Sequence, residues 1–538
     1  MKKVISLMLV LVMLLASLTM LFSCKDGEGE GSESVSETLA ETKETSVTLE
    51  ETNEYHENLF ISAVPVDELD FDGEEIVIMI RNDAKVKMEW GKDTPVDELD
   101  EAILARNETV ASNLNLTVTY TYHASSDAGL CYNTFKDLIQ GDVKNDLHEY
   151  DIAANFGYYA GGVDFRDYTA NLLDTDQFPY FDFRLPCWNQ SVVKHSNING
   201  QSLCCGGDLT LTMFNFAMVI WHNKDLYTQL RNDDDPADIQ DLVLAGEWTA
   251  AEFYKWCNIY ENSSTDDCDT YGVYIQGESW CTQPTDAIPF AWDLDLMIQN
   301  SDGTHSYNVV GNDKAEEAIV LFRKMYGGQG NGFLHTYKGN CKNGGCFYAG
   351  NIVFQGDVLC WDENQSLKLR AIDFDYALLP WPMYDESQWD AENETGYYTT
   401  AQDCYTLLTV LDHYNSTIPT KGEAVSAYLQ YSTEQSYTEV RGMYFEKIVR
   451  GKLLGTNDES TGAVTKSRKI FDMIIDDLQF DYWALYSSSL GHIMHLFRYC
   501  AAQSEDTLEN RYMTQKTTYD DALLATEIWF GLIEDPNA

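Results

Sequence analysis

The stretch Glu75–Arg81, with the sequence EIVIMIR, decides the fold class together with two later stretches of similar character. Leu116–Tyr122 reads LTVTYTY, and Tyr150–Phe156 reads YDIAANF. Each is a short run dominated by apolar, aromatic or β-branched residues, which is the composition of a strand in a sheet. The sequence therefore predicts three strands near the start of the folded chain.

Helical patterns separate these strands. Thr94 and Pro95 suit the cap and the first turn of a helix, and apolar residues from Leu99 to Leu114 then recur at helical spacing. A second helix is predicted around residues 134–140. Strand, helix, strand, helix, strand is typical of a parallel sheet with crossover helices, so we expect an α/β lobe here.

The later part of the chain continues in both kinds of element. Ala217–Asn223 (AMVIWHN) predicts another strand, and Thr249 is expected to cap a helix that runs to Asn258. The end of the chain is expected to be helical, over residues 466–478, 485–500 and 519–533.

Composition excludes several classes of partner. The chain has 538 residues, with 87 Asp and Glu against 35 Lys and Arg, and a formal net charge of −52. Nucleic acid is not an expected partner because phosphate binding needs clustered cations. With 44% hydrophobic and 13% aromatic residues, most of the chain is expected to fold, and its length suits two lobes.

The first residues predict export. Met1–Lys3 is a short cationic region, and Val4–Phe22 is uncharged and apolar. Leu21–Cys24 (LFSC) matches the bacterial lipobox, so residues 1–23 are interpreted as a lipoprotein signal peptide and Cys24 as the lipidation site. A permanent signal anchor and an ordinary signal peptide are the alternatives. Residues 24–60, rich in Glu, Ser, Thr and Gly, are expected to form a disordered acidic tether.

Chemical motifs are sparse in this sequence. Twelve cysteines follow Cys24; Cys341 and Cys346 are the best local candidates for a disulfide. For Cys204–Cys205 one buried and one paired thiol is favoured over a vicinal disulfide. The sequence contains no zinc spacing, calcium loop, glycine-rich phosphate loop or serine-nucleophile elbow. We therefore expect no metal, no cofactor and no catalytic residues, although a pair of carboxylates for glycoside hydrolysis is not excluded by counting.

Several segments, in order along residues 70–480, resemble bacterial extracellular solute-binding proteins of ABC transporters, the large class that includes carbohydrate binders. They are DEAILARN at Asp100–Asn107, Leu172–Asp174 followed by Leu185–Trp188, Asn199–Gln201, Gly207–Asp208, Trp221–Lys224, Leu244–Thr249, Asp375–Tyr376, Pro380–Pro382 and Asp385–Gln388. The many cysteines and the abundance of Tyr and Trp depart from the pattern usual in that class.

The resemblance implies a two-lobed, periplasmic-binding-protein-like α/β fold. Each lobe would be a mainly parallel sheet flanked by helices, with a helical C-terminal region. Lobe 1 is expected at residues 70–213, with about 400–450 returning to it. Lobe 2 is expected at residues 214–399, with about 451–538 as its helical C-terminal part.

The resemblance also implies a function. The chain would be a monomeric receptor, anchored by lipid at the extracellular face of the cell membrane, which captures a solute between its lobes and delivers it to an ABC permease. The aromatic surplus favours a carbohydrate, because sugar rings pair apolar faces with polar rims.

The candidate ligand-binding residues are flat aromatics with polar groups near them. They are Trp188, Trp221, Trp280, Trp292 and Trp361 as aromatic walls, Asp208 and Asp293 as hydroxyl acceptors, and Tyr398 near a predicted second crossing between lobes. Trp248, in the segment GEWT, is expected to be structural. We expect Trp188→Ala to weaken binding without altering the fold.

Two other classes of function share these features. A secreted carbohydrate-active enzyme would also have the export signal and the aromatics, but would need an acid and a nucleophile across a cleft. A surface glycan-binding lipoprotein without a transporter is the second alternative.

Overall fold

The structure is a computed structural model of the chain, and one body, Ile61–Ala538, holds the described elements. The described residues are 61–91, 94–123, 128–261, 269–275, 283–326, 333–334, 345–360, 368–369, 371–413, 421–449, 465–503 and 506–535. The predicted signal peptide, Cys24 and the predicted tether lie outside them, as do Cys341, Trp280 and Trp361.

The first sheet confirms the three predicted N-terminal strands. It contains β1 (Glu74–Arg81), β2 (Leu116–His123), β3 (Ile152–Phe156) and β12 (Thr406–Val410), in the order β12-β3-β1-β2. β1 runs parallel to both β2 and β3, whereas β12 joins from far along the chain and lies antiparallel to β3.

The first predicted helix begins later than expected. α4 (Glu98–Asn113) starts after Asp97, whose side chain accepts a hydrogen bond from the backbone N–H of Asp100. Asp97 is therefore the cap in place of Thr94, because a carboxylate there satisfies an otherwise unpaired amide at the helix start. The second predicted helix is longer than residues 134–140 and spans Ala128–Lys144 (α5).

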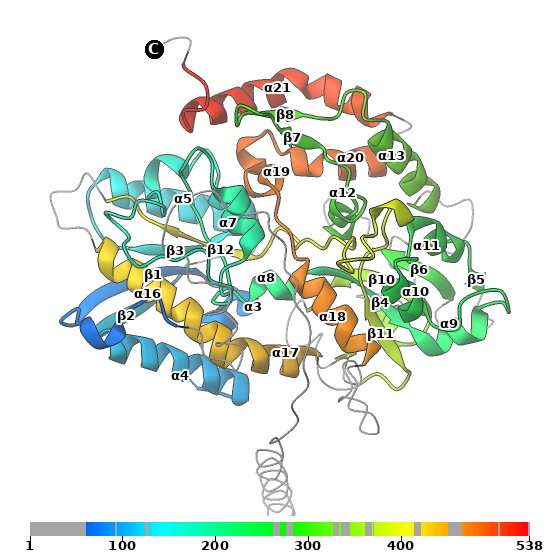
Figure 1. The fold of residues 1–538 in the computed structure, drawn as a ribbon, viewed down its shortest axis with the longest axis horizontal. Coiled ribbons are helices and arrows are strands. Elements are labelled where there is room, and N and C mark those ends of the chain that lie inside the picture. Colours follow the sequence, from blue (N-terminus) through cyan, green and yellow to red (C-terminus); the bar gives the residue numbers. More distant parts are fainter. Residues whose placement is uncertain are drawn as a thin grey trace, which may run out of the picture. The chain divides into compact units, whose positions relative to one another are not determined.

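The second sheet is mixed in direction. Its main path is β11 (Tyr376–Leu379), β4 (Met218–Asn223), β10 (Ile352–Val358), β6 (Thr270–Ile275) and β5 (Tyr260–Glu261), with β9 (Phe333–Leu334) pairing with β6. β10 is parallel to β6 but antiparallel to β4, so this sheet is less parallel than the resemblance implied. Figure 1 shows the two sheets as separate groups of arrows joined through the region of α8 (Thr212–Asn215).

Shorter elements surround the sheets. They are α3 (Ala84–Trp90), α6 (Gly157–Ala160), α7 (Gln190–Ser196), α9 (Lys224–Leu230), α10 (Ile239–Ala245), α11 (Ala250–Trp256), α12 (Ile288–Ala291), α13 (Asp313–Tyr326), α14 (Gly345–Tyr348), α16 (Gly422–Gln435), α17 (Arg441–Val449), β7 (Met297–Gln299) and β8 (His305–Tyr307). Thr249 directly precedes α11, as predicted, but its side chain makes no capping hydrogen bond, and the helix ends at Trp256 and not at Asn258. Trp248 is buried and donates its indole N–H to the carbonyl of Pro380.

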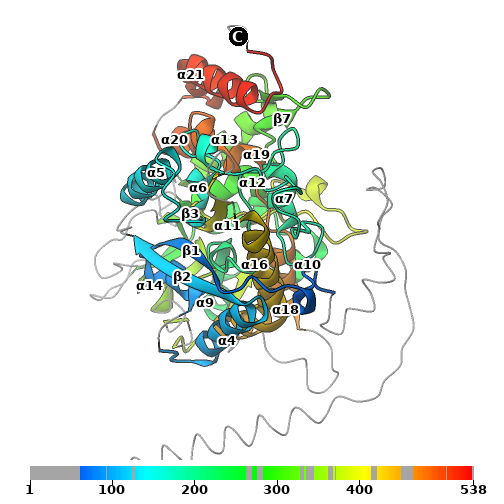
Figure 2. The same ribbon diagram turned by 90° about the vertical axis from the view of Figure 1, so that its left-hand side faces the viewer.

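The C-terminal region is helical, as expected, but its helices have other limits. They are α18 (Lys466–Asp476), α19 (Tyr482–Leu485), α20 (Leu496–Gln503) and α21 (Leu508–Trp529). The helix expected over residues 485–500 is interrupted because Gly491 and His492 both have positive φ angles, of 69° and 66°. α18 packs against α10 and β11, and α20 and α21 pack against α13; the two views of Figures 1 and 2 agree on this last grouping.

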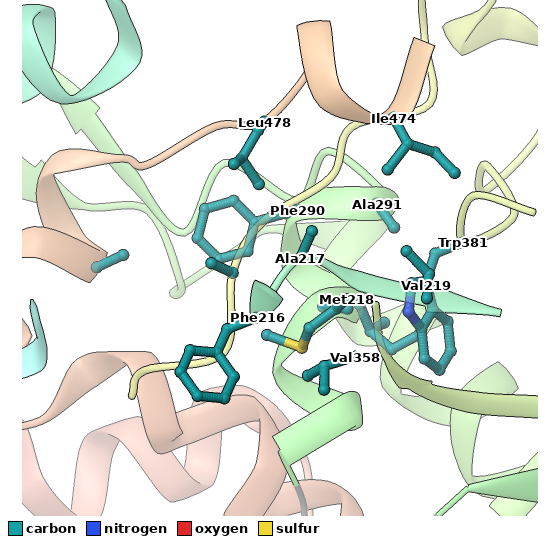
Figure 3. Packing of buried hydrophobic residues seen from close by; sticks show 14 of the residues in the cluster. Phe216, Ala217, Met218, Val219, Phe290, Ala291, Val358, Trp381, Ile474 and Leu478 are labelled. Carbon is teal, nitrogen blue, oxygen red and sulfur yellow. The ribbon is translucent and has the colours of Figure 1, made fainter. Parts of the chain in front are cut away.

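Three segments of chain lie side by side where the two sheet regions connect. The amide of Met218 donates to the carbonyl of Thr400, and the amide of Gln479 donates to the carbonyl of Thr399 at 2.7 Å. The first segment precedes β4, the second leads toward β12 and the third leaves α18. Figure 3 shows the apolar packing around them, with Phe216 and Leu478 on the same side of the cluster as Phe290.

The structure also bears on the predicted cysteine pairing and on membrane-spanning helices. Cys204 and Cys205 are both free and buried, so the expected disulfide of one of them is wrong. Within the described ranges, no helix combines the length and the apolar character needed to cross a bilayer.

Candidate functional site

A cavity of about 960 Å³ opens beside these connecting segments. We call it the cleft. Its lining comes from residues 186–198, 207–214, 293–305 and 475–483, with Tyr398 and Arg441. Both predicted lobes therefore contribute to its wall. The volume of the cavity lies within the range that is usual for small-molecule pockets of proteins.

One wall of the cleft follows from an alternating sequence. In Trp292–Leu296 (WDLDL) the apolar side chains are buried, whereas Asp293 is half-buried and Asp295 is exposed. Both aspartates have positive φ angles, of 50° and 45°, a conformation that Asp and Asn tolerate better than most residues. The local backbone thus holds two carboxylates at the cleft while the alternate side chains anchor the loop.

The segment after α18 forms a second wall in a similar way. Leu478 and Phe480 are buried, and Asp477, Gln479 and Asp481 are half-buried beside the cleft. Their position depends on backbone pairing, since Leu478 forms an isolated parallel bridge with Thr399.

Helix α7 ties this second wall to the first lobe. The Ser191 hydroxyl accepts from the amide of Phe480 at 2.8 Å and donates to the carbonyl of the same residue at 3.3 Å. The Asn189 side chain caps α7 at Val192 and also donates to the carbonyl of Leu478. A helix of lobe 1 and the segment after α18 therefore meet at the rim of the cleft; Figure 1 shows α7 close to α19 in this region.

Asp208 is the most deeply buried carboxylate of the lining. Its amide donates to the carbonyl of Cys187, and the preceding Gly207 is so close that a Cβ there would lie 2.2 Å from that same oxygen. Nε of Arg441 lies 3.5 Å from Oδ1 of Asp208. Burial raises the pKa of Asp208 to about 7, and the nearby Arg441 only partly offsets this effect.

The acidic groups of the other walls influence one another. Burial raises the pKa of Asp477 to about 6, and the charge of Asp476 adds to the rise. The pKa of Asp295 is raised by partial burial and then by Asp293 and Asp481. Burial raises the pKa of Tyr398, and the negative charges of Asp293 and Asp477 add to the rise.

Aromatic rings complete the lining. Trp483 stacks on Phe290 with ring centroids 4.6 Å apart, and its indole N–H donates to Asp481. Tyr482 stacks on His305 at 3.9 Å. Together with the half-buried Tyr398, they set aromatic groups beside carboxylates and amides.

Solved structures resemble this architecture, whereas no protein-family model and no curated protein sequence matches the chain. The GacH receptor of Streptomyces glaucescens, described unliganded and with acarbose, is 11% identical, with 84% of this chain and 99% of that chain covered at a TM-score of 0.50. An ABC transporter solute-binding protein of Thermotoga lettingae bound with α-D-tagatose is 12% identical (84% and 100% covered, TM-score 0.49). A substrate-binding protein of Listeria monocytogenes with cycloalternan is also 12% identical (86% and 100%, TM-score 0.46).

This chain has a two-lobed, periplasmic-binding-protein-like α/β fold similar to that of the GacH receptor. Four of the predicted ligand-binding residues of this binding-protein fold line the cleft: Trp188, Asp208, Asp293 and Tyr398. They come from segments far apart in the sequence, and the fold brings them to one cavity.

Trp188 is among the residues that line the cleft, but its side chain is buried in the core. It is 1% exposed, its indole N–H donates to Oε1 of Gln430 at 3.0 Å, and its ring packs against Phe181 and Phe183. The expectation that Trp188→Ala leaves the fold unaltered therefore needs correction, because such a ring supports its surroundings.

Two predicted aromatics belong to the hydrophobic core. Trp221 is 1% exposed in β4 and donates its indole N–H to the carbonyl of Val358. Trp292 is fully buried against Phe322 and Tyr384. Since both rings are enclosed by protein, their placement favours packing over ligand contact. Trp280 and Trp361 lie outside the described residues, so their predicted role stays a prediction.

Sequence reasoning missed several lining residues, namely Asp295, Arg441, Asp476, Asp477 and Asp481. The alternation in WDLDL was a usable signal for Asp295. Arg441 reaches the cleft from the start of α17, whereas Asp476, Asp477 and Asp481 lie at the end of α18 and in the segment after it, which pairs with Thr399. Among the described residues, no group of three or more His, Cys, Asp or Glu side chains is arranged to hold a metal ion.

Proposed function

We propose that this chain is the solute-binding receptor of an ABC importer and that its ligand is a carbohydrate bound in the cleft. The observation that carries the proposal is the cleft itself, where Asp208, Asp293 and Tyr398 meet in a cavity of about 960 Å³. Solved proteins of the same fold support it, since their names describe complexes with sugars such as acarbose.

The lining matches the chemistry of a sugar. Carboxylates and amides accept and donate the hydrogen bonds that ring hydroxyls need, and charged acceptors make the stronger bonds. Tyr398, which is half-buried, offers aromatic surface for the apolar faces of the rings. Asp208 and Asp293 act as acceptors from opposite lobes, so one ligand bridges them.

Ligand binding would favour a closed arrangement of the lobes. The connecting segments at Met218, Thr399 and Gln479 would form the hinge, because they pair with one another where the two sheet regions connect. A ligand that contacts both lobes binds the closed form more tightly and shifts the population toward it. The permease would then recognise the closed receptor.

Lipid on Cys24 would keep the receptor at the outer face of the membrane. The acidic segment 24–60 would act as a spacer, and tethering raises the effective concentration of receptor near its permease. Cys24→Ala should release the protein into the medium of producing cells, whereas retention of that variant in the membrane fraction would argue for a signal anchor.

Isothermal titration against a panel of oligosaccharides, paired with a hydrolysis assay on the same sugars, tests the function. We expect saturable binding without turnover, and a loss of at least tenfold in affinity for Tyr398→Ala. Release of a hydrolysis product would overturn the receptor proposal in favour of a carbohydrate-active enzyme. Binding that is unchanged in Tyr398→Ala would remove the cleft as the site.

A further inference from the structure

The charge of the cleft is unusually one-sided. Six aspartates line it, against the permanent cations Lys194 and Arg441. With the histidines neutral, the lining carries four more negative than positive charges when all six are ionised, and three more when Asp208 is protonated. The aspartates are Asp208, Asp293, Asp295, Asp476, Asp477 and Asp481. They come from three separate segments, so the surplus is a property of the cavity and not of one acidic run.

Protein cations neutralise only part of this surplus. Arg441 is paired with Asp208, Lys314 from α13 lies 3.9 Å from Oδ2 of Asp293, and Nδ1 of His195 lies 3.2 Å from Oδ1 of Asp481. Within the described part of the chain, Asp295 and Asp476 form no ion pair at 4.0 Å or less. Both are exposed at the cleft, where a ligand can reach them.

Two residues of the lining also have unused hydrogen-bonding capacity. Oδ1 of Asp208 and the hydroxyl of Tyr482 are buried and, among the described residues, have no hydrogen-bond partner. Asp208 is 2% exposed and Tyr482 is 6% exposed, and both line the cleft. A buried carboxylate oxygen or hydroxyl without a partner carries an energetic penalty, which a ligand donor relieves.

We propose that the carbohydrate taken by this cleft carries a protonated amine, as an amino sugar does. The inference rests on the proposed function and names its substrate class. An ammonium group donates three hydrogen bonds and accepts none, which suits a lining of carboxylates. It also supplies the positive charge that the lining lacks.

A neutral sugar fits the same lining less well. Its hydroxyls can donate to the aspartates, but closing the lobes over it brings the carboxylates out of water without a counter-charge. A cationic sugar removes this repulsion as the cleft closes. Selectivity for the amine therefore comes from the uncompensated carboxylates more than from any single hydrogen bond.

Three trisaccharides of one linkage test the proposal on the full chain. Glucosamine trimer, its fully N-acetylated form and cellotriose differ at C2, which carries an ammonium, an acetamide or a hydroxyl. At pH 6.0, isothermal titration should give at least tenfold tighter binding of the glucosamine trimer than of the other two. That preference should shrink between 20 and 300 mM salt, because ionic strength screens charge.

Variants tie the preference to the cleft. Asp295→Asn with Asp476→Asn should reduce the preference for the glucosamine trimer severalfold, because it weakens binding of this ligand more than binding of the neutral trimers. Asn also tolerates the positive φ angle of residue 295, so the loop is expected to keep its shape. Asp233→Asn, which neutralises an exposed carboxylate between α9 and α10, is the matched control and should change neither value.

The possible failures are distinguishable. Equal or tighter binding of a neutral trimer overturns the cationic ligand but keeps the sugar receptor. If no trimer and no member of the wider oligosaccharide panel binds, the proposed function falls and this inference falls with it. Tighter binding of spermidine than of any sugar would show a cation site without carbohydrate recognition and would overturn both.

Discussion

Nε of Arg441, at the start of α17, lies 3.5 Å from Oδ1 of Asp208 in the loop that precedes α8. Asp208 is nearly inaccessible to water, whereas Arg441 is partly exposed. The pair connects the loop before α8 with helix α17, which comes much later in the chain. It also controls the charge state of the deepest carboxylate in the cleft.

Arg441→Gln should destabilise the protein mainly above pH 7. In the wild type, the pKa of Asp208 is about 7, above its value in the unfolded chain, so the contribution of Asp208 to stability falls as pH rises to 7 and is constant beyond. Without Arg441 the pKa of Asp208 is higher still, so the contribution of Asp208 to stability continues to fall above pH 7. We expect a loss of about 1–3 kcal/mol at pH 8.5 and little at pH 6.0, measured by urea unfolding.

The double variant Asp208→Asn with Arg441→Gln is the control for this pH dependence. It has no carboxylate at the position, so the extra loss between pH 6.0 and 8.5 should disappear. An equal destabilisation by Arg441→Gln at both pH values would mean that the arginine acts through packing alone.

Glu89 provides a second test of pH dependence, away from the cleft. This fully buried carboxylate accepts hydrogen bonds from the amide and hydroxyl of Thr212 and from the hydroxyl of Thr406, yet burial raises its pKa to about 7. Its contribution to stability is complete at low pH and is lost between about pH 4.5 and 7. Glu89→Gln should remove this loss, which has an upper limit of about 3 kcal/mol.

Chemical denaturation at pH 5.0 and 8.0 measures the effect. The difference in unfolding free energy between the two pH values should be smaller in Glu89→Gln than in wild type. Glu101→Gln, on the exposed side of α4, should keep the wild-type difference. An unaltered difference in Glu89→Gln would contradict the assignment.

Trp188 should matter more for stability than for affinity. Because its ring is 1% exposed, Trp188→Ala should cost about 3–5 kcal/mol and Trp188→Phe about 1–2 kcal/mol, the latter chiefly through the lost hydrogen bond to Gln430. Trp188→Phe should bind sugar within twofold of wild type. A tenfold weaker affinity, with normal stability, would instead make the ring a ligand contact.

Gly207 should not tolerate a side chain. A Cβ at this position meets the carbonyl of Cys187 at 2.2 Å, and the loop that carries Asp208 must shift to relieve the clash. Gly207→Ala should therefore lower the stability of the protein by roughly 2 kcal/mol or more, and should also lower its affinity for the ligand.

Gly141→Ala is the matched control: residue 141 lies in α5 with open space around it, so alanine should stabilise the protein by up to about 1 kcal/mol. Normal affinity in Gly207→Ala would show that Asp208 does not need this loop geometry.

The strands were largely readable from local sequence. The predicted ranges Glu75–Arg81, Leu116–Tyr122 and Ala217–Asn223 differ from β1, β2 and β4 by one residue at a boundary. They were readable because buried strands need a short run of suitable side chains, whatever their partners are. The start of α4 was misplaced because two candidate caps lie close together, and the choice between Thr94 and Asp97 depends on the path of the preceding chain.

The cleft was only partly readable. Asp208 and Asp293 were proposed from a family resemblance and a ligand argument, and both line the cavity. Trp221 and Trp292 show the limit of that reasoning, since a tryptophan in a core and one in a binding site look alike in sequence. Arg441 and Asp477 carried no local signal at all.

Local sequence by itself determined the α/β character of the chain, the strands β1, β2 and β3 of the first sheet and β4 of the second, because side-chain period and composition act over a few residues. Tertiary structure alone decided which acidic residues share a cavity. Asp477 reaches the cleft because its segment pairs with Thr399, and Asp208 is buried because Gly207 packs on Cys187. Such placements depend on contacts between residues far apart in the chain, and the charge of the cleft follows from them.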